Sequence, residues 1–140
     1  MNKHVRVTAL GAALFLCGAL GTASAAPLVE QHAGSIAYVT GGVGDSEDAA
    51  IKQMMPQYSV SMTFAERQGD KAVYLADVPV SVRDSNGQTV LNIKTNGPYL
   101  LVRLPAGRYT LEASHQGRTE SRSISVTSAH SSQAVVFEWS

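Results

Sequence analysis

The chain has 140 residues, in which 11 lysines and arginines balance 11 aspartates and glutamates, and it contains one cysteine. A chain without a basic surplus gives no electrostatic reason to expect a nucleic-acid partner or an anionic-lipid partner. A single cysteine cannot form a disulfide within the chain, so we expect the fold to depend on packing alone.

The N-terminal stretch predicts a secretory signal peptide. Lys3 and Arg6 precede an apolar run over residues 7–20, and the small residues 23–25 follow it. This order is typical of export signals, and the apolar run is too short to span a bilayer comfortably. We therefore expect cleavage after Ala25, loss of the cysteine with the signal, and a mature periplasmic chain without a stable membrane anchor. The remaining length suits one domain with a single core.

Residues 26–57 are expected to form an N-terminal segment with a glycine-rich loop and a short helix. Within the stretch "YVTGGVGDSEDAAIKQMMP", Gly41, Gly42 and Gly44 resemble a phosphate cradle at first sight. Such a loop usually needs a lysine that reaches the phosphate and a parallel sheet behind it. The nearest lysine lies well inside the predicted helix, and the rest of the chain has an antiparallel pattern. We therefore expect a turn here rather than a phosphate site.

The helix is predicted over about residues 46–55 and ended by Pro56. Asp45, Glu47 and Asp48 fall in or beside its first turn. Carboxylates there satisfy exposed N–H groups, complement the helix dipole and repel an incoming anion. We expect an apolar stripe formed by Ala50, Ile51, Met54 and Met55.

Residues 58–140 predict an all-β domain, because apolar residues recur there at every second position, which is the strand period. Turn residues interrupt this pattern about once in ten residues. We therefore predict a seven-stranded antiparallel two-sheet sandwich. The expected strands are 58–64, 73–84, 88–95, 99–104, 108–115, 119–127 and 133–140. The expected turns include residues 84–87, 96–98, 105–107 and 116–117.

The alternation also divides each strand into two faces. One face of three strands carries Tyr58, Val60, Met62 and Phe64; Tyr109, Leu111 and Ala113; and Val135, Phe137 and Trp139. The opposite faces carry Ser59, Ser61 and Thr63; Arg108, Thr110 and Glu112; and Val136 and Glu138. We expect the first set to include the core residues.

Two strands have features of a sheet edge. Pro79 has no N–H to donate, so its strand is expected to be an edge strand or a bulged strand. Arg118, Glu120 and Arg122 alternate with small polar residues, which predicts a solvated strand face. The alternative is a charged strip that protects an exposed edge or meets a protein partner.

Residues 75–126 resemble the carboxypeptidase regulatory-like domain, a small sandwich related in shape to transthyretin. The likeness is strongest at residues 78–80, at Asp84 with the Asn86–Gly87 turn, and at residues 104–109. The mature chain also looks like a group of short secreted proteobacterial proteins of unknown role that carry this domain alone. The resemblance implies a transthyretin-like sandwich. It also implies an accessory role, because in larger enzymes the related domain accompanies a zinc peptidase whose motif is missing from this chain.

We expect a non-enzymatic binding or accessory module without a cofactor, and an envelope protein or a carbohydrate as its partner. The candidate contact residues are Gly41, Gly42, Gly44 and Asp45, together with an edge strand near Pro79. A bulky residue at Gly42 is expected to impair partner capture with little effect on thermal stability. A hydrolase ranks last, since no serine stands in a Gly-x-Ser-x-Gly elbow.

A periplasmic copper-binding protein is the alternative hypothesis. Thioethers suit Cu(I) and imidazoles suit Cu(II). The candidate ligands are His32, His115, His130, Met54, Met55 and Met62. No two of them share the spacing of a binding motif, and the methionines occupy predicted apolar faces. We therefore expect no metal site.

Overall fold

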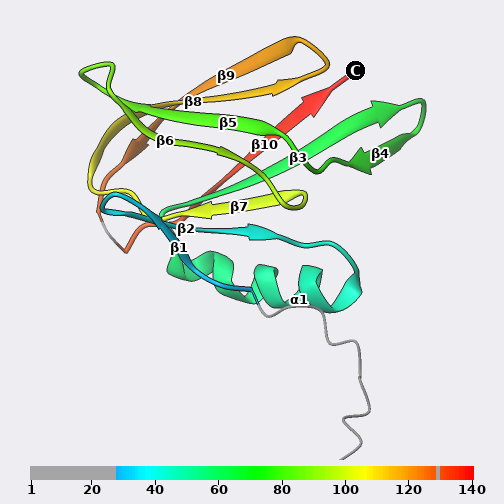
Figure 1. The fold of residues 1–140 in the computed structure, drawn as a ribbon, viewed down its shortest axis with the longest axis horizontal. Coiled ribbons are helices and arrows are strands. Elements are labelled where there is room, and N and C mark those ends of the chain that lie inside the picture. Colours follow the sequence, from blue (N-terminus) through cyan, green and yellow to red (C-terminus); the bar gives the residue numbers. More distant parts are fainter. Residues whose placement is uncertain (1–27, 129) are drawn as a thin grey trace, which may run out of the picture.

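The computed structural model describes residues 28–128 and 130–140 (Figure 1). The predicted signal peptide and its cleavage site lie outside these residues. The described chain forms ten strands, one α-helix and one 3-10 helix. In order they are β1 (Gln31–Ala33), β2 (Ile36–Gly41), α1 (Asp45–Met54), η1 (Met55–Gln57), β3 (Val60–Gln68), β4 (Lys71–Tyr74), β5 (Pro79–Asp84), β6 (Thr89–Lys94), β7 (Tyr99–Val102), β8 (Gly107–His115), β9 (Arg118–Val126) and β10 (Gln133–Trp139).

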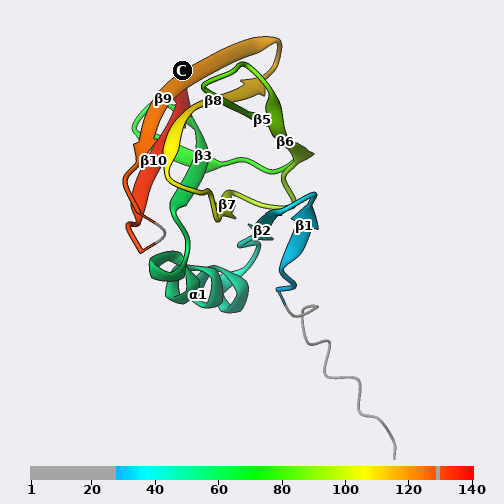
Figure 2. The same cartoon turned by 90° about the vertical axis from the view of Figure 1, so that its left-hand side faces the viewer.

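The strands form two sheets, as predicted. The six-stranded sheet has the order β1-β2-β7-β3-β10, with β4 also paired to β3, and the four-stranded sheet has the order β6-β5-β8-β9. Figures 1 and 2 show three layers, in which the six-stranded sheet lies between the four-stranded sheet and α1. The mostly β class and the short helix are thus confirmed, whereas the described strands number ten rather than seven.

The sheets are not wholly antiparallel, which corrects the prediction. Strand β10 runs parallel to β3, with Gln133 opposite Val60 and Trp139 opposite Glu66. After β9 the chain passes from one sheet to the other, and the Gln133 N–H donates to the Ser59 carbonyl oxygen at 3.0 Å. Because the chain enters beside the start of β3, it continues in the same direction as β3.

The main hydrophobic core lies between the two sheets. The six-stranded sheet contributes Val60, Met62, Phe64, Phe137 and Trp139, among others, and the four-stranded sheet contributes Val80, Val82, Leu111 and Ala113. A second cluster, under α1, contains Val39, Ile51, Tyr58, Tyr99 and Leu101. The predicted core faces are therefore confirmed except at Tyr58, which belongs to the second cluster. The six-stranded sheet is covered on both faces where α1 lies.

Helix α1 begins and ends one residue earlier than predicted, and Pro56 lies in the following 3-10 turn. Ile51 is fully buried, and Met54 and Met55 pack against the second cluster. Ala50 is exposed and does not belong to the apolar stripe, which is a correction.

The predicted edge position of Pro79 is wrong. Strand β5 lies inside its sheet, between β6 and β8. Pro79 is the first residue of β5 and pairs with Lys94 of β6, whereas pairing to β8 begins only at Val80. Its missing N–H therefore removes no bond to β8, which agrees with the tolerance of proline at the start of a strand. The irregular pairing was expected, and it occurs between Val82 and Arg83.

Glu120 and Arg122 of the charged strip lie on the core side of β9, although their side chains remain 36% and 41% exposed, and Arg118 is exposed as predicted. Glu120 and Arg122 stand opposite Ala113 and Leu111, which belong to the core side of β8. The Arg122 guanidinium lies 5.3 Å from the centre of the Phe137 ring. Because β9 is an edge strand, this geometry fits the alternative that inward charges protect the edge from pairing with another chain.

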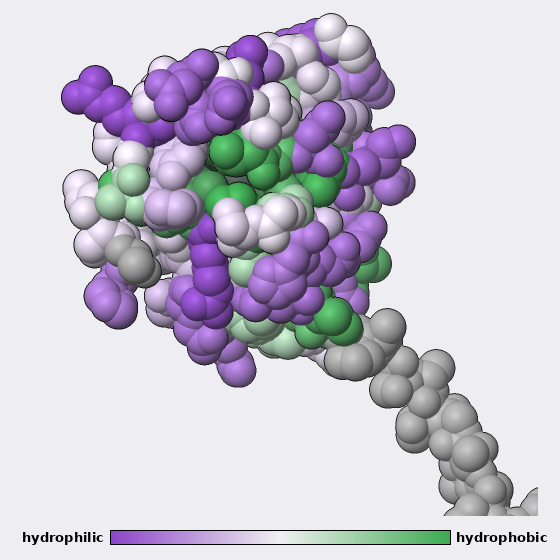
Figure 3. All heavy atoms as spheres, turned by 60° about the vertical axis from the view of Figure 1, so that its left-hand side comes forward, coloured by the Kyte–Doolittle hydropathy of each residue, from purple (hydrophilic) through white to green (hydrophobic). Residues whose placement is uncertain are grey.

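Large exposed apolar side chains occur at five described positions: Val29, Val43, Val73, Tyr74 and Val136. Figure 3 shows a mainly hydrophilic face with a strip of apolar residues across its middle. Within the described part of the chain, none of the helices has the length and apolar character needed to cross a membrane.

Two buried serines provide a matched pair for a stability test. Ser59 and Ser61 were expected on a polar face, but each is only 3% exposed. The Ser59 hydroxyl donates to the Leu104 carbonyl oxygen at 3.1 Å and accepts the Leu104 N–H at 3.0 Å. The Ser61 hydroxyl has no partner among the described residues.

We expect Ser59→Ala to lower the free energy of unfolding by about 1–3 kcal/mol, because it leaves a buried N–H and a buried C=O unpaired. Ser61→Ala should cause little change or a slight gain, since it removes an unpaired hydroxyl. Urea titration of both variants measures the difference. Equal losses would show that the Ser59 bonds contribute nothing specific.

Candidate functional site

The glycine-rich loop is closed by the protein's own carboxylate. Strand β2 ends at Gly41, and the Gly42 N–H donates to Glu47 Oε1 at 2.8 Å. Gly44 is the N-cap of α1, and because it has no side chain it cannot form a side-chain capping bond. Asp48 instead pairs with Lys52 at 2.8 Å, one turn along the helix. The acids do occupy the first turn, but only Glu47 reaches the loop, where it takes the place that an anion would need.

The glycines of this region are required by close packing. Gly42 has φ +103°, and a Cβ there would lie 2.3 Å from Cδ2 of Tyr99. A Cβ on Gly97 would lie 2.4 Å from the backbone oxygen of Gly41. The expectation that a bulky residue at Gly42 leaves stability unchanged is therefore wrong, because its Cβ position is occupied by a buried ring.

A hollow of about 370 Å³ lies beside this loop, and we call it the loop hollow. It is lined by Leu28, Val29, Gln31, Thr40, Val43, Glu47 and Asn96. Val29 is 62% exposed and Val43 is 60% exposed, so two of the five large exposed apolar side chains meet at one place. The hollow therefore combines an apolar rim with a few polar groups, a combination typical of binding sites.

The polar base of the loop hollow is held in place by hydrogen bonds. The buried Thr40 hydroxyl donates to the Tyr99 carbonyl oxygen at 2.9 Å and accepts the Asn96 N–H at 3.0 Å. The Gln31 side-chain oxygen accepts the Tyr38 hydroxyl at 3.1 Å. These bonds join strand β2 to the start of β7 and to β1, so the hollow has a preorganised base.

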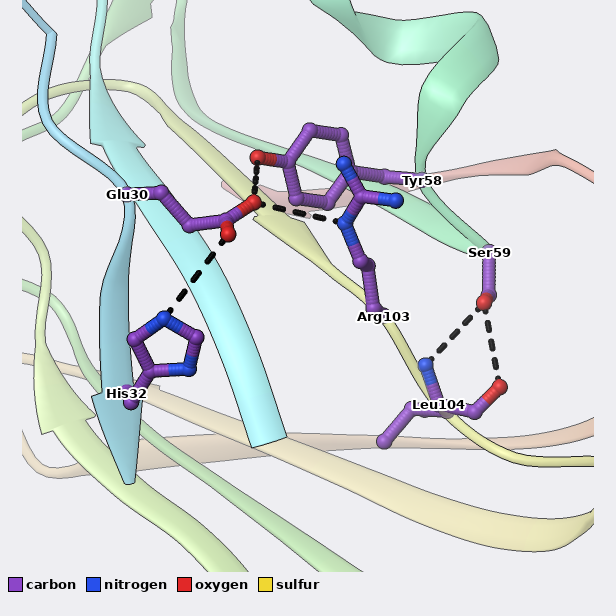
Figure 4. Close-up of polar contacts among 6 residues, drawn as sticks. All are labelled: Glu30, His32, Tyr58, Ser59, Arg103 and Leu104. Atoms are coloured by element: carbon purple, nitrogen blue, oxygen red, sulfur yellow. Dashed lines mark hydrogen bonds and ion pairs between the residues drawn. The ribbon is translucent and has the colours of Figure 1, made fainter. Parts of the chain in front are cut away.

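The side wall of the loop hollow is anchored by a polar cluster next to β1 (Figure 4). The Tyr58 hydroxyl donates to Glu30 Oε2 at 2.5 Å, and Arg103 Nε donates to the same oxygen at 3.3 Å. The Arg103 guanidinium also lies over the Tyr58 ring, 4.5 Å from its centre. His32 Nε2 lies 3.8 Å from the other Glu30 oxygen. The residues that precede β1 are thereby tied to the ends of β7 and η1.

The electrostatics of this cluster agree with its geometry. The Tyr58 hydrogen bond, with Arg103 contributing, holds the pKa of Glu30 below its ordinary value. Burial, and then the bond to Glu30, raises the pKa of Tyr58. Glu30 therefore remains an anion that accepts both hydrogen bonds across the neutral pH range.

The predicted contact residues shape the loop but do not line the hollow. Gly41 and Gly42 are buried, whereas Gly44 and Asp45 are exposed at the start of α1. Sequence reasoning missed Val43, which lies between the glycines, and the distant Val29 and Asn96. The exposed valine was the available signal, because a β-branched apolar residue between glycines is unusual in a turn that serves only to reverse the chain. Partner binding by these residues stays a prediction.

The candidate copper ligands lie in different surroundings. Met62 is fully buried in the main core, and Met54 and Met55 pack under α1. His115 contacts Glu66 at 2.6 Å. His32 lies at the polar cluster described above, and His130 is exposed. Across residues 28–128 and 130–140, no three histidine, cysteine or acidic side chains gather where they could hold a metal ion.

The His115–Glu66 pair joins the two sheets, since His115 ends β8 and Glu66 lies in β3. A hydrogen bond from Gln68, and then one from His115, lowers the pKa of Glu66. A carboxyl whose pKa is lower in the folded chain stabilises the fold above its unfolded pKa, and this contribution is lost as the pH falls through the folded pKa.

We therefore expect Glu66→Gln to lose less stability on acidification than the parent chain, with the difference developing below about pH 5. Urea unfolding at a series of pH values measures it. An identical loss of stability in both chains would rule out a folded-state role for this carboxylate.

No protein-family model matches the chain, and no curated protein matches it. In the described chain, the loop hollow brings together the exposed side chains of Val29 and Val43, the Asn96 N–H that donates to Thr40, and the Glu47 carboxylate that accepts the Gly42 N–H.

Proposed function

We propose that the protein is an exported, non-enzymatic β-sandwich that acts as a periplasmic binding or accessory module, and that the loop hollow binds an envelope protein. The N-terminal export pattern and the resemblance of residues 75–126 to a carboxypeptidase regulatory-like domain support this proposal. A transthyretin-like arrangement of the sandwich is part of the same proposal.

The observation that carries the proposal is the pair of exposed valines on one preorganised hollow. Val29 and Val43 lie on the rim, and each leaves most of its side chain in water. Covering a valine side chain contributes about 1.5–3 kcal/mol, so an apolar group of a partner would gain free energy here. An apolar rim favours a protein side chain over a carbohydrate, whose surface consists mainly of hydroxyl groups.

The polar groups of the hollow suit a polypeptide. The Asn96 and Gln31 side chains lie beside the apolar rim and carry amides, which can bond to a peptide backbone. Glu47 is held by the Gly42 N–H and supplies a fixed negative charge. We therefore expect an extended partner segment with one apolar side chain in the hollow and its backbone against the amides.

Site-specific photocrosslinking in the producing cells tests this proposal. Val43 is the position for the crosslinker, because Gly41 and Gly42 are buried and a side chain at either would meet neighbouring atoms. Val136 on β10 is the matched control, since it is also a valine and is 55% exposed. We expect one discrete adduct from position 43, none from position 136, and loss of the adduct when Val29→Asp is added. Adducts of equal yield from both positions, or from neither, would contradict the proposal.

A further inference from the structure

A second hollow, of about 410 Å³, lies on the four-stranded sheet, and we call it the hydroxyl hollow. It is lined by Asp84, Ser85, Arg108, Tyr109, Thr110, Ser123, Ile124 and Ser125. These residues belong to β8, β9, the end of β5 and the turn that follows it, on the sheet that does not contact α1 (Figure 1). The hydroxyl hollow shares no residue with the loop hollow.

Four polar side chains of the hydroxyl hollow project from the outer face of the sheet. Arg108 stands opposite Ser125, and Thr110 stands opposite Ser123. Each of these positions alternates with Tyr109 or Ile124, which pack toward the main core. A strand places successive side chains on opposite faces, so one arginine and three hydroxyls are presented together to solvent.

Arg108 differs from the other described arginines because its guanidinium is uncommitted. The other five are engaged as Arg67–Glu138, Arg83–Glu112, Arg103–Glu30, Arg122–Glu120 and Arg118 with the Ser140 oxygen. Within residues 28–128 and 130–140, the Arg108 side chain forms no hydrogen bond or ion pair with another residue. Its planar donor fork is therefore available, and that fork matches a carboxylate with two parallel bonds.

Asp84 lies at one end of the hollow but on the other face of the sheet. It stands opposite Tyr109 of β8, so its side chain lies on the core side, where its Oδ1 accepts the N–H groups of Asn86 and Gln88 at 2.9 and 3.0 Å. The outer face therefore combines one cation, Arg108, with three hydroxyls, which suits a ligand that carries one acidic group and several hydroxyl groups.

We propose that the hydroxyl hollow binds an acidic saccharide, with the carboxylate of a uronic acid on Arg108 and sugar hydroxyls on Thr110, Ser123 and Ser125. Hydroxyl side chains both donate and accept, as sugar hydroxyls do, so the pairs are complementary in either direction. The volume falls within the range of roughly 300–1,000 Å³ found for small-molecule sites. This site goes beyond the proposed function, because it uses another sheet and another class of ligand.

Calorimetric titration of the purified exported chain tests the site with three probes: an acidic trimer that has one terminal galacturonic acid and two galactose units, the neutral galactose trimer and inorganic phosphate. We expect saturable binding of the acidic trimer, and binding of the neutral trimer and of phosphate at least about tenfold weaker. In NMR spectra the amide shifts on titration should centre on residues 84–85, 108–110 and 123–125.

Two variants separate charge from hydroxyl contacts. Arg108→Gln should weaken the acidic trimer by at least about tenfold, whereas Arg67→Gln, which removes the same charge from the other sheet, should leave its affinity unchanged. A Ser123→Ala, Ser125→Ala double variant should weaken both trimers and leave phosphate unaffected. The proposal is overturned if no saturable binding occurs, if Arg108→Gln binds like the parent chain, or if phosphate binds as tightly as the acidic trimer.

Discussion

Gly42→Ala is expected to destabilise the chain by about 3 kcal/mol, the sum of a backbone term of about 1 kcal/mol and a packing term of about 2 kcal/mol. Gly42 has φ +103°, which L-residues rarely adopt. Its new Cβ would lie 2.3 Å from Cδ2 and 2.8 Å from Cε2 of Tyr99. That ring is only 2% exposed and packs in the second cluster, so it has little room to move. Guanidinium titration measures the loss.

Alanine substitutions at Gly97 and Gly44 measure the packing term and the backbone term separately. Gly97→Ala adds a Cβ 2.4 Å from the backbone oxygen of Gly41 without a positive φ, so its loss of about 2 kcal/mol reports packing alone. Gly44→Ala has φ +83° but no atom within 4 Å, so its loss of about 1 kcal/mol reports backbone strain alone. Losses below about 0.5 kcal/mol at all three positions would mean that the loop does not require glycine.

Phe137→Ala is expected to cost about 3–5 kcal/mol, as for other buried aromatic residues. Phe137 is fully buried at the centre of an aromatic row. Its ring centre lies 5.5 Å from that of Phe64 and 6.2 Å from that of Trp139. The cavity left by alanine would remove contacts on both sides and also the surface on which the Arg122 guanidinium lies.

Val136→Ala is the matched control, because Val136 is the neighbouring residue on β10 and points out of the core. It should change stability by less than about 0.5 kcal/mol. The two variants are compared by urea unfolding monitored through Trp139, the one tryptophan of the chain. Similar losses at both positions would contradict the assigned faces of β10.

The sequence pattern was sufficient to predict the core residues of a strand that buries only one of its faces. Strands β8 and β10 alternate, and their core sides were predicted residue by residue. Strand β2 was missed because all of its residues are buried. The main core covers one face and α1 covers the other, so both faces are mostly apolar and no alternation with a period of two is visible in the sequence.

The cover that α1 provides also explains why the burial of Ser61 was not predicted. Ser61 faces the side that α1 covers, since it pairs with Leu101 of the second cluster. A serine in an alternating strand normally indicates a solvent face, and only the position of the helix overrides that pattern. The parallel pairing of β10 was likewise beyond the sequence pattern, because a strand's own residues do not specify the direction of its neighbour.

The candidate site was predicted in part. The glycines and the first-turn acids located the loop, and the absence of a phosphate site there stays a prediction. The hollow itself could not be predicted, because its walls come from residues 28–31, 40–47 and Asn96, which meet only in the folded chain. The bond from Gly42 to Glu47 depends on the path of the loop into α1, which residue types alone do not define.

The dissociation constant of the protein captured at Val43, measured for the Val43→Asp and Val136→Asp variants, tests most directly whether the loop hollow is the partner site. If the loop hollow is the binding surface, Val43→Asp should weaken binding by at least about tenfold, because a charge replaces a valine that the partner buries. Val136→Asp should bind like the parent chain, and both variants should unfold at the parent temperature. Equal affinities for the two variants would contradict the assignment of the loop hollow as the partner site.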